Sequence, residues 1–158
     1  ALSLFFAQDK PELEPIVNFL KECKREFKLA NMEDICMSLK TNNYEKYIVE
    51  DYNKLEFLKG CPINVRAAGY HNYLLNNSKY KRKYSLIGNG EKLKMYHCKD
   101  AACSVFSFSP GSHPYEFAPE VDYELQFEKC MIDPLNRVIS AIGLQTLDRN
   151  LIYSSTLF

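Results

Sequence analysis

The sequence lacks the residue patterns that usually mark a catalytic centre. Two-metal chemistry needs carboxylates at short spacing on a rigid turn, and the aspartates here stand far apart: Asp51, Asp100, Asp122 and Asp148. Neither a glycine-rich phosphate loop nor a Gly-x-Ser-x-Gly turn occurs in the sequence. The three histidines, which have no clear Asp or Ser partner, are His71, His97 and His113. We therefore expect no catalytic residue in this chain.

The six cysteines could supply metal ligands or disulfides. No two of them form a Cys-x-x-Cys pair. A zinc site can be drawn from His97, Cys98, Cys103 and His113, but its spacing matches no familiar ligand pattern. A chain of 158 residues is large enough to fold without disulfides. We expect free, mostly buried thiols in a reducing compartment, and no metal or cofactor.

The cations give the strongest chemical signal. The formal net charge is zero, yet residues 79–99 hold seven basic residues and one acid, while residues 116–133 hold six acids and one base. A neutral domain with separated charge can present a positive face that attracts phosphate groups. The densest cluster is Lys79-Tyr80-Lys81-Arg82-Lys83-Tyr84. Most exposed cationic loops bind nothing specific, but the position of this cluster directly after a helix that could contact DNA favours phosphate contacts.

Residues 59–72 read as a turn that leads into a helix. Gly60 supplies backbone freedom, and Pro62 has a φ suited to a first helical position. The predicted apolar stripe is Ile63, Ala67, Tyr70 and Leu74. Arg66 leaves from another face, beside small residues, which suits close approach to a phosphate backbone.

Periodicity predicts the other elements. We expect helices over 9–29, capped by Asp9, and over 121–131, continued from Pro134 to Gly143. The cations Lys21, Lys24, Arg25 and Lys28 are expected on a solvated face of the first helix. Alternation indicates strands over 85–88, 92–98 and 103–109, whose pairing would gather the basic residues of 79–94 into one patch. Residues 34–40 alternate like a strand although propensity would allow a helix, and 44–58 should include a short helix.

The expected fold class is α+β, with helices packed on a small antiparallel sheet. Hydrophobic residues make up 46% of the chain and charged residues 25%, which is typical of a globular domain. No apolar run approaches the roughly 18 residues that span a membrane.

Six short motifs resemble, in the same order, the thumb of family B DNA polymerases, most closely those of T4-like bacteriophages. They are Asn42-Asn43-x-x-Lys46-Tyr47, Gly60-x-Pro62-x-x-x-Arg66-Ala67, Gly90-Glu91-Lys92, Pro110-Gly111, Glu128-Lys129 and Pro134-Leu135. The resemblance implies a polymerase-thumb-like fold that grips duplex DNA through phosphates, independently of base sequence. It favours a strand over 34–40. The related polymerases carry a lysine where this chain has Asp133, which weakens a DNA contact there.

The resemblance and the charge pattern together give a set of candidate DNA-contacting residues. They are Lys40, Asn42, Asn43, Lys59, Arg66, Asn72, Lys79, Lys81, Arg82, Lys83, Lys92, Lys94 and Lys129. Lys40, Asn42 and Asn43 could equally well serve only the local turn, because Asn and Thr commonly satisfy backbone groups there.

The resemblance also implies domains, partners and a location. Residues 1–146 would form the thumb, with 1–8 as the cut end of the preceding polymerase region. Residues 147–158 would form a tail that docks Leu157 and Phe158 on a sliding clamp. Further partners would be primer–template DNA and the remaining polymerase domains, in the cytoplasm of an infected bacterial host. Without the palm carboxylates the chain should not polymerise alone.

Two other functions stay open. One is a stand-alone nucleic-acid-binding module that stacks single-stranded bases on Tyr80 and Tyr84. The other is a protein-interaction domain with no role in nucleic-acid binding.

Overall fold

The computed structural model describes residues 13–49, 51 and 53–143. These residues divide into two compact units, one of residues 31–122 and the other of residues 13–30 and 123–143. Helices and a three-stranded antiparallel sheet make up the structure, which confirms the predicted α+β class. Asp9 and the predicted boundary between residues 146 and 147 lie outside the described residues.

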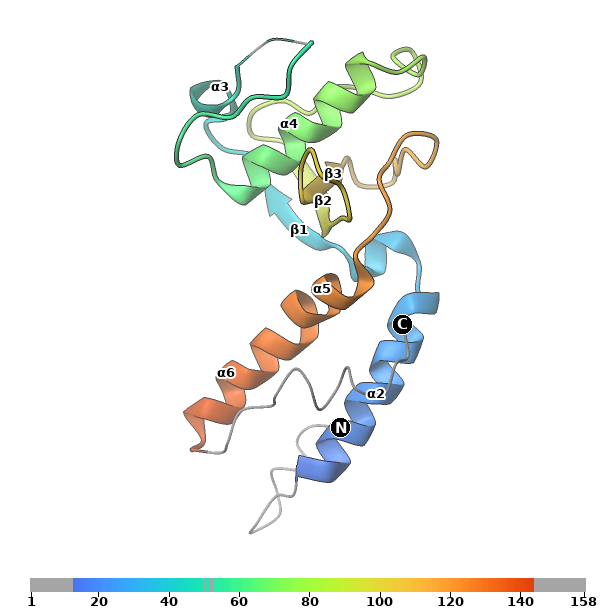
Figure 1. Ribbon diagram of the computed structural model, residues 1–158, viewed down its shortest axis with the longest axis vertical. Coiled ribbons are helices and arrows are strands. Elements are labelled where there is room, and N and C mark those ends of the chain that lie inside the picture. Colours follow the sequence, from blue (N-terminus) through green and yellow to red (C-terminus); the bar gives the residue numbers. More distant parts are fainter. Residues whose placement is uncertain (1–12, 50, 52, 144–158) are drawn as a thin grey trace. The chain divides into compact units, whose positions relative to one another are not determined.

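The sheet belongs to the unit of residues 31–122 (Figure 1). Its strands are β1 (Met37–Lys40), β2 (Lys92–His97) and β3 (Val105–Phe108), in the order β1-β2-β3. Both pairs are antiparallel, and Lys40 lies opposite Lys92 while Lys94 lies opposite Phe108. β2 and β3 match the strands predicted over 92–98 and 103–109. The strand predicted over 34–40 begins only at Met37, because Met32–Ile35 form a 3-10 turn, η1.

Two helices complete this unit, α3 (Tyr44–Tyr47) and α4 (Ile63–Asn76). The predicted turn before α4 is present, with Gly60 at φ +82°. Pro62 is the N-cap rather than the first helical residue, because its ψ of 152° is extended. The predicted apolar stripe is wrong at its first position: Ile63 is 38% exposed, whereas the middle of α4 is buried on several faces, from Val65 to Asn72.

The strand predicted over 85–88 is absent from the described sheet, since these residues have no regular structure. The physical reason is the partner of Ile87. Its N–H donates to Asn72 Oδ1 at 2.8 Å, and its carbonyl accepts from Asn72 Nδ2 at 2.9 Å. A side-chain amide of α4 therefore satisfies the backbone that a neighbouring strand would otherwise pair. A turn follows at Asn89 and Gly90, with Gly90 at φ +80°.

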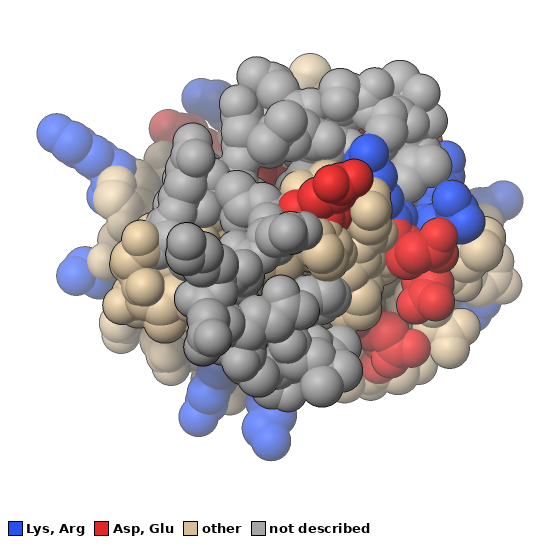
Figure 2. All heavy atoms as spheres, turned by 90° about the horizontal axis from the view of Figure 1, so that it is seen from below, with Lys and Arg blue, Asp and Glu red and all other residues tan. Residues whose placement is uncertain are grey.

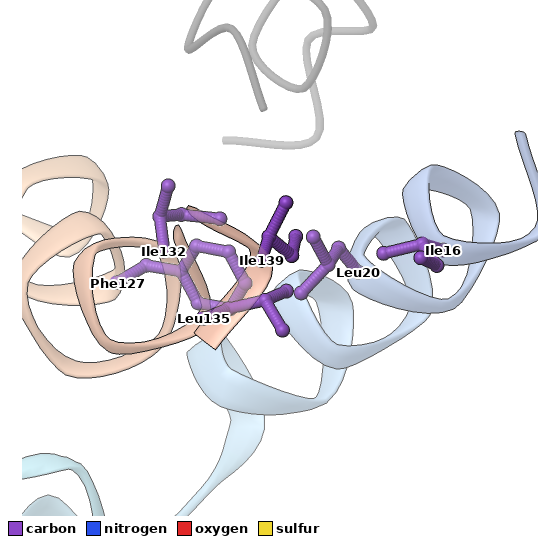
Figure 3. Packing of buried hydrophobic residues seen from close by; sticks show 6 residues of the cluster. All are labelled: Ile16, Leu20, Phe127, Ile132, Leu135 and Ile139. Carbon is purple, nitrogen blue, oxygen red and sulfur yellow. The ribbon is translucent and has the colours of Figure 1, made fainter. Parts of the chain in front are cut away.

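The second unit pairs α2 (Leu13–Leu29) with a helical run of three parts. These are α5 (Tyr123–Phe127), a π-helical turn η2 (Glu128–Ile132) and α6 (Asp133–Ala141). Figure 3 shows Ile16 and Leu20 of α2 beside Phe127, Ile132, Leu135 and Ile139, which form one buried cluster. The helix predicted from residue 121 starts at Tyr123, because Val121 forms a β-bridge with Cys98.

Two details of this unit correct the sequence prediction. Leu135, Val138, Ile139 and Ile142 recur at helical spacing, which predicts one apolar face of the last helix, yet Val138 and Ile142 are about half exposed, at 49% and 51%. Lys24, expected on a solvated face, is 1% exposed. Burial lowers the pKa of Lys24, and the nearby Glu124 carboxylate opposes that shift. The core of this unit therefore includes one unexpected lysine and excludes two apolar residues of the last helix.

Candidate nucleic-acid interface

Strand pairing places three lysines on one face of the sheet. Lys40 lies directly opposite Lys92, and Ser38 lies opposite Lys94. Because cross-strand partners and residues two apart on one strand share a face, Lys40, Lys92 and Lys94 project to the same side. Lys94 Nζ donates to Ser38 Oγ at 2.8 Å. We call these three residues the strand lysines.

A shallow groove runs along the strand lysines. It is lined by all three of them together with Ser38, Leu39, Leu93 and Pro110. Among the described ion pairs, none involves a strand lysine. Like charges placed directly opposite on paired strands repel each other. An anion bound between Lys40 and Lys92 would remove that repulsion, so this arrangement suits a phosphate group.

The basic loop, residues 79–84, is held by a neighbouring acidic segment. Lys83 and Tyr84 both donate to the Glu116 carboxylate, the latter through its hydroxyl at 2.5 Å. Partial burial alone would raise the pKa of Glu116, but these two hydrogen bonds lower it to about 2. Lys83 is therefore paired within the fold. Lys79, Lys81 and Arg82 remain exposed, and none of them is in a described ion pair.

The loop tyrosines pack against Phe117. The Tyr80 ring stacks on it at 6.3 Å between centroids, and the Tyr84 ring meets it edge-on at 5.7 Å. Each ring thus has an aromatic partner inside the fold, and a lysine ammonium group lies over each of them, Lys79 over Tyr80 and Lys83 over Tyr84. This packing reduces the aromatic surface that single-stranded bases could use.

Arg66 lies in the first turn of α4 near two thiols. Its positive charge acts to lower the pKa of Cys61 and Cys103, although burial raises both. The Arg66 Nε atom is buried with no hydrogen-bond partner, and no described ion pair includes Arg66. One turn later, Tyr70 donates to Asp100 on the loop between β2 and β3. Arg66 is thus a partly buried cation that has no ion-pair partner among the described residues.

Three further candidate residues stand on exposed turns: Lys59, Asn42 and Asn43. Asn43 is left-handed at φ 57°, a conformation that asparagine tolerates better than most residues. Its conformation shapes the start of α3, where it is the N-cap residue without a side-chain capping bond. A local turn role therefore accounts for the choice of asparagine, and the exposed side chain leaves a phosphate contact sterically open.

Asn72, a predicted DNA contact, uses its side-chain amide for hydrogen bonds inside the fold. It is 7% exposed and, besides both Ile87 bonds, donates to the Tyr44 hydroxyl at 2.8 Å. A phosphate could reach this amide only if those hydrogen bonds broke. We therefore remove Asn72 from the candidate interface and assign it a structural role.

The remaining predicted sites lie elsewhere. Lys129 is in the unit of residues 13–30 and 123–143, where its Nζ lies 3.5 Å from the Asp133 carboxylate. That pairing competes with a phosphate contact at the position where the sequence departs from related polymerases. The predicted clamp-binding residues Leu157 and Phe158 lie outside the described residues.

The cysteines are free thiols, as predicted. Only Cys98 and Cys103 are buried, and the other four are half-buried, so the expectation of mostly buried thiols is wrong. Cys98 donates to the Cys103 carbonyl at 3.2 Å, and burial raises the pKa of the Cys98 thiol to about 12. A protonated thiol is a poor metal ligand. Within the described ranges, no group of three or more His, Cys, Asp or Glu side chains could hold a metal ion.

Charge of both signs reaches the surface. Figure 2 shows one face on which acidic and basic side chains both occur, some of them adjacent. The positive regions are therefore local clusters on a neutral chain. The strand lysines and the basic loop are two such clusters, and no described contact joins them, because residues 85–88 do not form the strand that was expected to link them.

No protein-family model matches this chain, and no curated protein matches it. The polymerase resemblance thus rests on the motifs between residues 40 and 143. In the part of the chain that the structure describes, no helix is both long and apolar enough to cross a bilayer. Sequence reasoning missed Ser38 and the pairing of Lys83 with Glu116, because both depend on contacts between distant segments.

Proposed function

We propose that this chain is the thumb of a family B DNA polymerase of the T4-like bacteriophage kind, and that it grips duplex DNA through phosphate contacts. The observation that carries the proposal is the alignment of Lys40, Lys92 and Lys94 along one groove, with none of the three in an ion pair described for this chain. Phosphate contacts of this type position a duplex and read no base sequence, as a moving polymerase requires.

The other cations extend this contact set. The exposed Lys79, Lys81 and Arg82 would bind further phosphates, and Arg66 and Lys59 would contribute from the turn before α4 and its first helical residues. In this proposal the chain holds the primer–template for the remaining polymerase domains, inside an infected bacterium. The tail at Leu157 and Phe158 would dock on the sliding clamp and raise processivity through effective concentration.

The chain has no catalytic role in this proposal. The palm carboxylates of such an enzyme would lie in another part of the polymerase, and this chain alone should not incorporate nucleotides. The proposal is therefore tested by binding, and activity assays on the isolated chain are uninformative.

The test is a duplex-binding titration of the full chain across about 50 to 200 mM salt. Each lost phosphate contact reduces the slope of log affinity against log salt by about 0.9. This slope should fall by about 2 to 3 in the variant Lys40→Gln/Lys92→Gln/Lys94→Gln. It should fall by a similar amount in Lys79→Gln/Lys81→Gln/Arg82→Gln. Arg66→Ala should lose about 1.

The matched control is Lys54→Gln. Lys54 is also exposed in the same unit, but it is already paired with Glu56 at 3.2 Å, so its loss should leave the slope unchanged. An unaltered slope in every test variant would overturn the proposal. A preference for single strands over duplex would favour the single-strand-binding alternative instead.

A further inference from the structure

The unit of residues 31–122 contains a second site, separate from the groove of the strand lysines. A pocket of about 230 Å³ lies beside α4, and none of its lining residues lines the lysine groove. Its apolar wall includes Ile48, Leu55 and Ile87, and the exposed side chains Val49 and Leu86 stand at its edge. A pocket of this size accommodates one aromatic or branched side chain, since a water molecule takes about 30 Å³.

The wall of the pocket is fixed by tight packing. Ile48 and Phe57 form a β-bridge, and Leu58 N donates to Tyr47 O at 2.8 Å. The bridged pair rests on Gly69 of α4, where an added Cβ would lie 2.7 Å from Ile48 Cδ1 and 2.9 Å from Phe57 Cε1. The cavity is therefore preformed rather than opened by a ligand.

One residue that lines the pocket has a buried polar atom with no hydrogen bond in the described part of the chain. Asn76 lines the pocket, and its Nδ2 atom is buried without a hydrogen bond. A buried donor left unpaired costs about 1–3 kcal/mol. A ligand carbonyl oxygen in the pocket would recover that cost once the Asn76 side chain turns its amide toward the cavity.

A second unpaired group at the edge of the pocket is the backbone of Leu86, within the part of the chain that is described. Ile87 turns both its N–H and its carbonyl toward Asn72, as a residue in a strand turns both groups toward one neighbour. Leu86, one residue earlier, must turn its N–H and carbonyl to the other side. In the part of the chain described, no hydrogen bond reaches the Leu86 backbone, and this residue is 45% exposed.

The charge at the pocket is acidic. Its described lining carries three carboxylates, those of Glu45, Asp51 and Glu56, and one ammonium group, Lys54, which is paired with Glu56. A phosphate-bearing ligand would be repelled here, and a basic ligand attracted.

We infer that this pocket binds an extended peptide segment of a protein partner. The segment places one apolar side chain in the cavity, pairs its backbone with Leu86 as an added strand, and carries lysine or arginine beside the anchor. Strand addition supplies affinity through main-chain hydrogen bonds, while the pocket and its charge select the side chains. This inference does not depend on DNA binding.

The test is a titration of the full ¹⁵N-labelled chain with short blocked peptides, followed by amide chemical shifts. The probe is acetyl-Gly-Lys-Phe-Lys-Gly-amide, compared with the same peptide carrying Glu for Lys or Ala for Phe. We expect the probe to bind at least about tenfold more tightly than either analogue. Its shifts should centre on the Leu86 backbone amide and the Asn76 side-chain amide.

Two further comparisons separate the parts of the inference. N-methylation of the probe, one position at a time, should abolish binding at one position at least, because it removes a backbone donor without altering the protein. Asn76→Ala should weaken binding about tenfold, while Asn77→Ala should not, since Asn77 is exposed and its Nδ2 bonds the Tyr73 carbonyl.

Several results would overturn the inference. Equal binding of the Glu-containing peptide would remove the charge selection. Tolerance of N-methylation at every position, together with equally tight binding of phenethylamine, would indicate a small-amine site instead. The absence of shifts at Asn76 with all probes would eliminate the site.

Discussion

Replacing Asn72 with alanine should be among the most costly single changes in the unit of residues 31–122. The substitution removes the acceptor for Ile87 N–H and the donor to Ile87 C=O. Ile87 is 1% exposed, so water cannot easily replace either bond. A buried polar group left unpaired costs about 1–3 kcal/mol, and we expect a total loss of about 3 kcal/mol in the free energy of unfolding.

The sharpest measurement is hydrogen exchange of the Ile87 backbone amide, because it reports this unit alone. In the native chain this amide should be protected by its 2.8 Å bond to Asn72. In Asn72→Ala it should exchange like an unpaired amide, and denaturant unfolding should show the lost stability. The pKa of His71, lowered chiefly by burial, should fall further, since the hydrogen bond with Asn72 acts to raise it.

Asn77→Ala is the matched control, since its exposed hydrogen bond to Tyr73 should be worth less than about 1 kcal/mol. The reasoning fails if Asn72→Ala keeps the protection of Ile87 and loses less than about 1 kcal/mol. It also fails if a fully folded Asn72→Ala chain loses salt-dependent duplex affinity, because Asn72 would then be a phosphate contact.

Three other outcomes test the packing and the electrostatics. In the native chain, stability should fall as the pH is lowered from 4.5, the ordinary pKa of Glu116, to its folded value of about 2. A depressed carboxyl pKa stabilises the fold in full only above that range. In Lys83→Gln, an NMR titration should show the Glu116 pKa rising toward 4.5. Gly69→Ala should cost about 1–3 kcal/mol by overpacking Ile48 and Phe57, and adding Ile48→Val should recover part of it in a double-mutant cycle. Ile139→Ala, in the buried cluster, should cost about 2–5 kcal/mol in denaturant unfolding, whereas the neighbouring, half-exposed Val138→Ala should stay within about 0.5 kcal/mol.

The elements with a strong local signal could be predicted from the sequence. The apolar period of α2, the Gly60 turn before α4 and the alternation of β2 are each contained in one short stretch. The strand predicted over residues 85–88 is absent for a physical reason. Their pattern predicts a backbone that pairs with a neighbouring strand, but the N–H and carbonyl of Ile87 pair with the side-chain amide of Asn72 instead. A local sequence pattern does not show which group will hydrogen-bond to the backbone.

Lys24 shows a signal that was present and was given too little weight. Ile16, Leu20 and Lys24 are spaced four residues apart, so they fall on one face of α2. Two of these positions are the most buried apolar residues of the helix, and the third is 1% exposed. The helical period alone thus placed Lys24 at the core. The expectation of a solvated cation came from residue type, which periodicity should have overruled.

The candidate interface depended on information that spacing does not contain. The sequence marked Lys92 and Lys94 as neighbours on one face, but Lys40 joins them only through the register of β1 on β2. A shift of one residue in that register would turn Lys40 to the other face. For the same reason the sequence did not predict the ion pair of Lys83 with Glu116, which lies in the acidic stretch that was expected to stay apart from the basic loop.

The register that aligns Lys40 with Lys92 also gives a physical argument for function. Two ammonium groups directly opposite on paired strands oppose sheet formation by a few tenths of a kcal/mol to about 1 kcal/mol. The fold bears this cost although either position could hold a neutral side chain, because both lysines are exposed and neither is in a described ion pair. A bound phosphate would replace this repulsion between the two lysines with attraction, since each lysine then faces an anion. Neutralising one of the pair should therefore stabilise the free chain and weaken its complex with DNA, two effects of opposite sign from one substitution. A purely structural pair of lysines would give no such opposition.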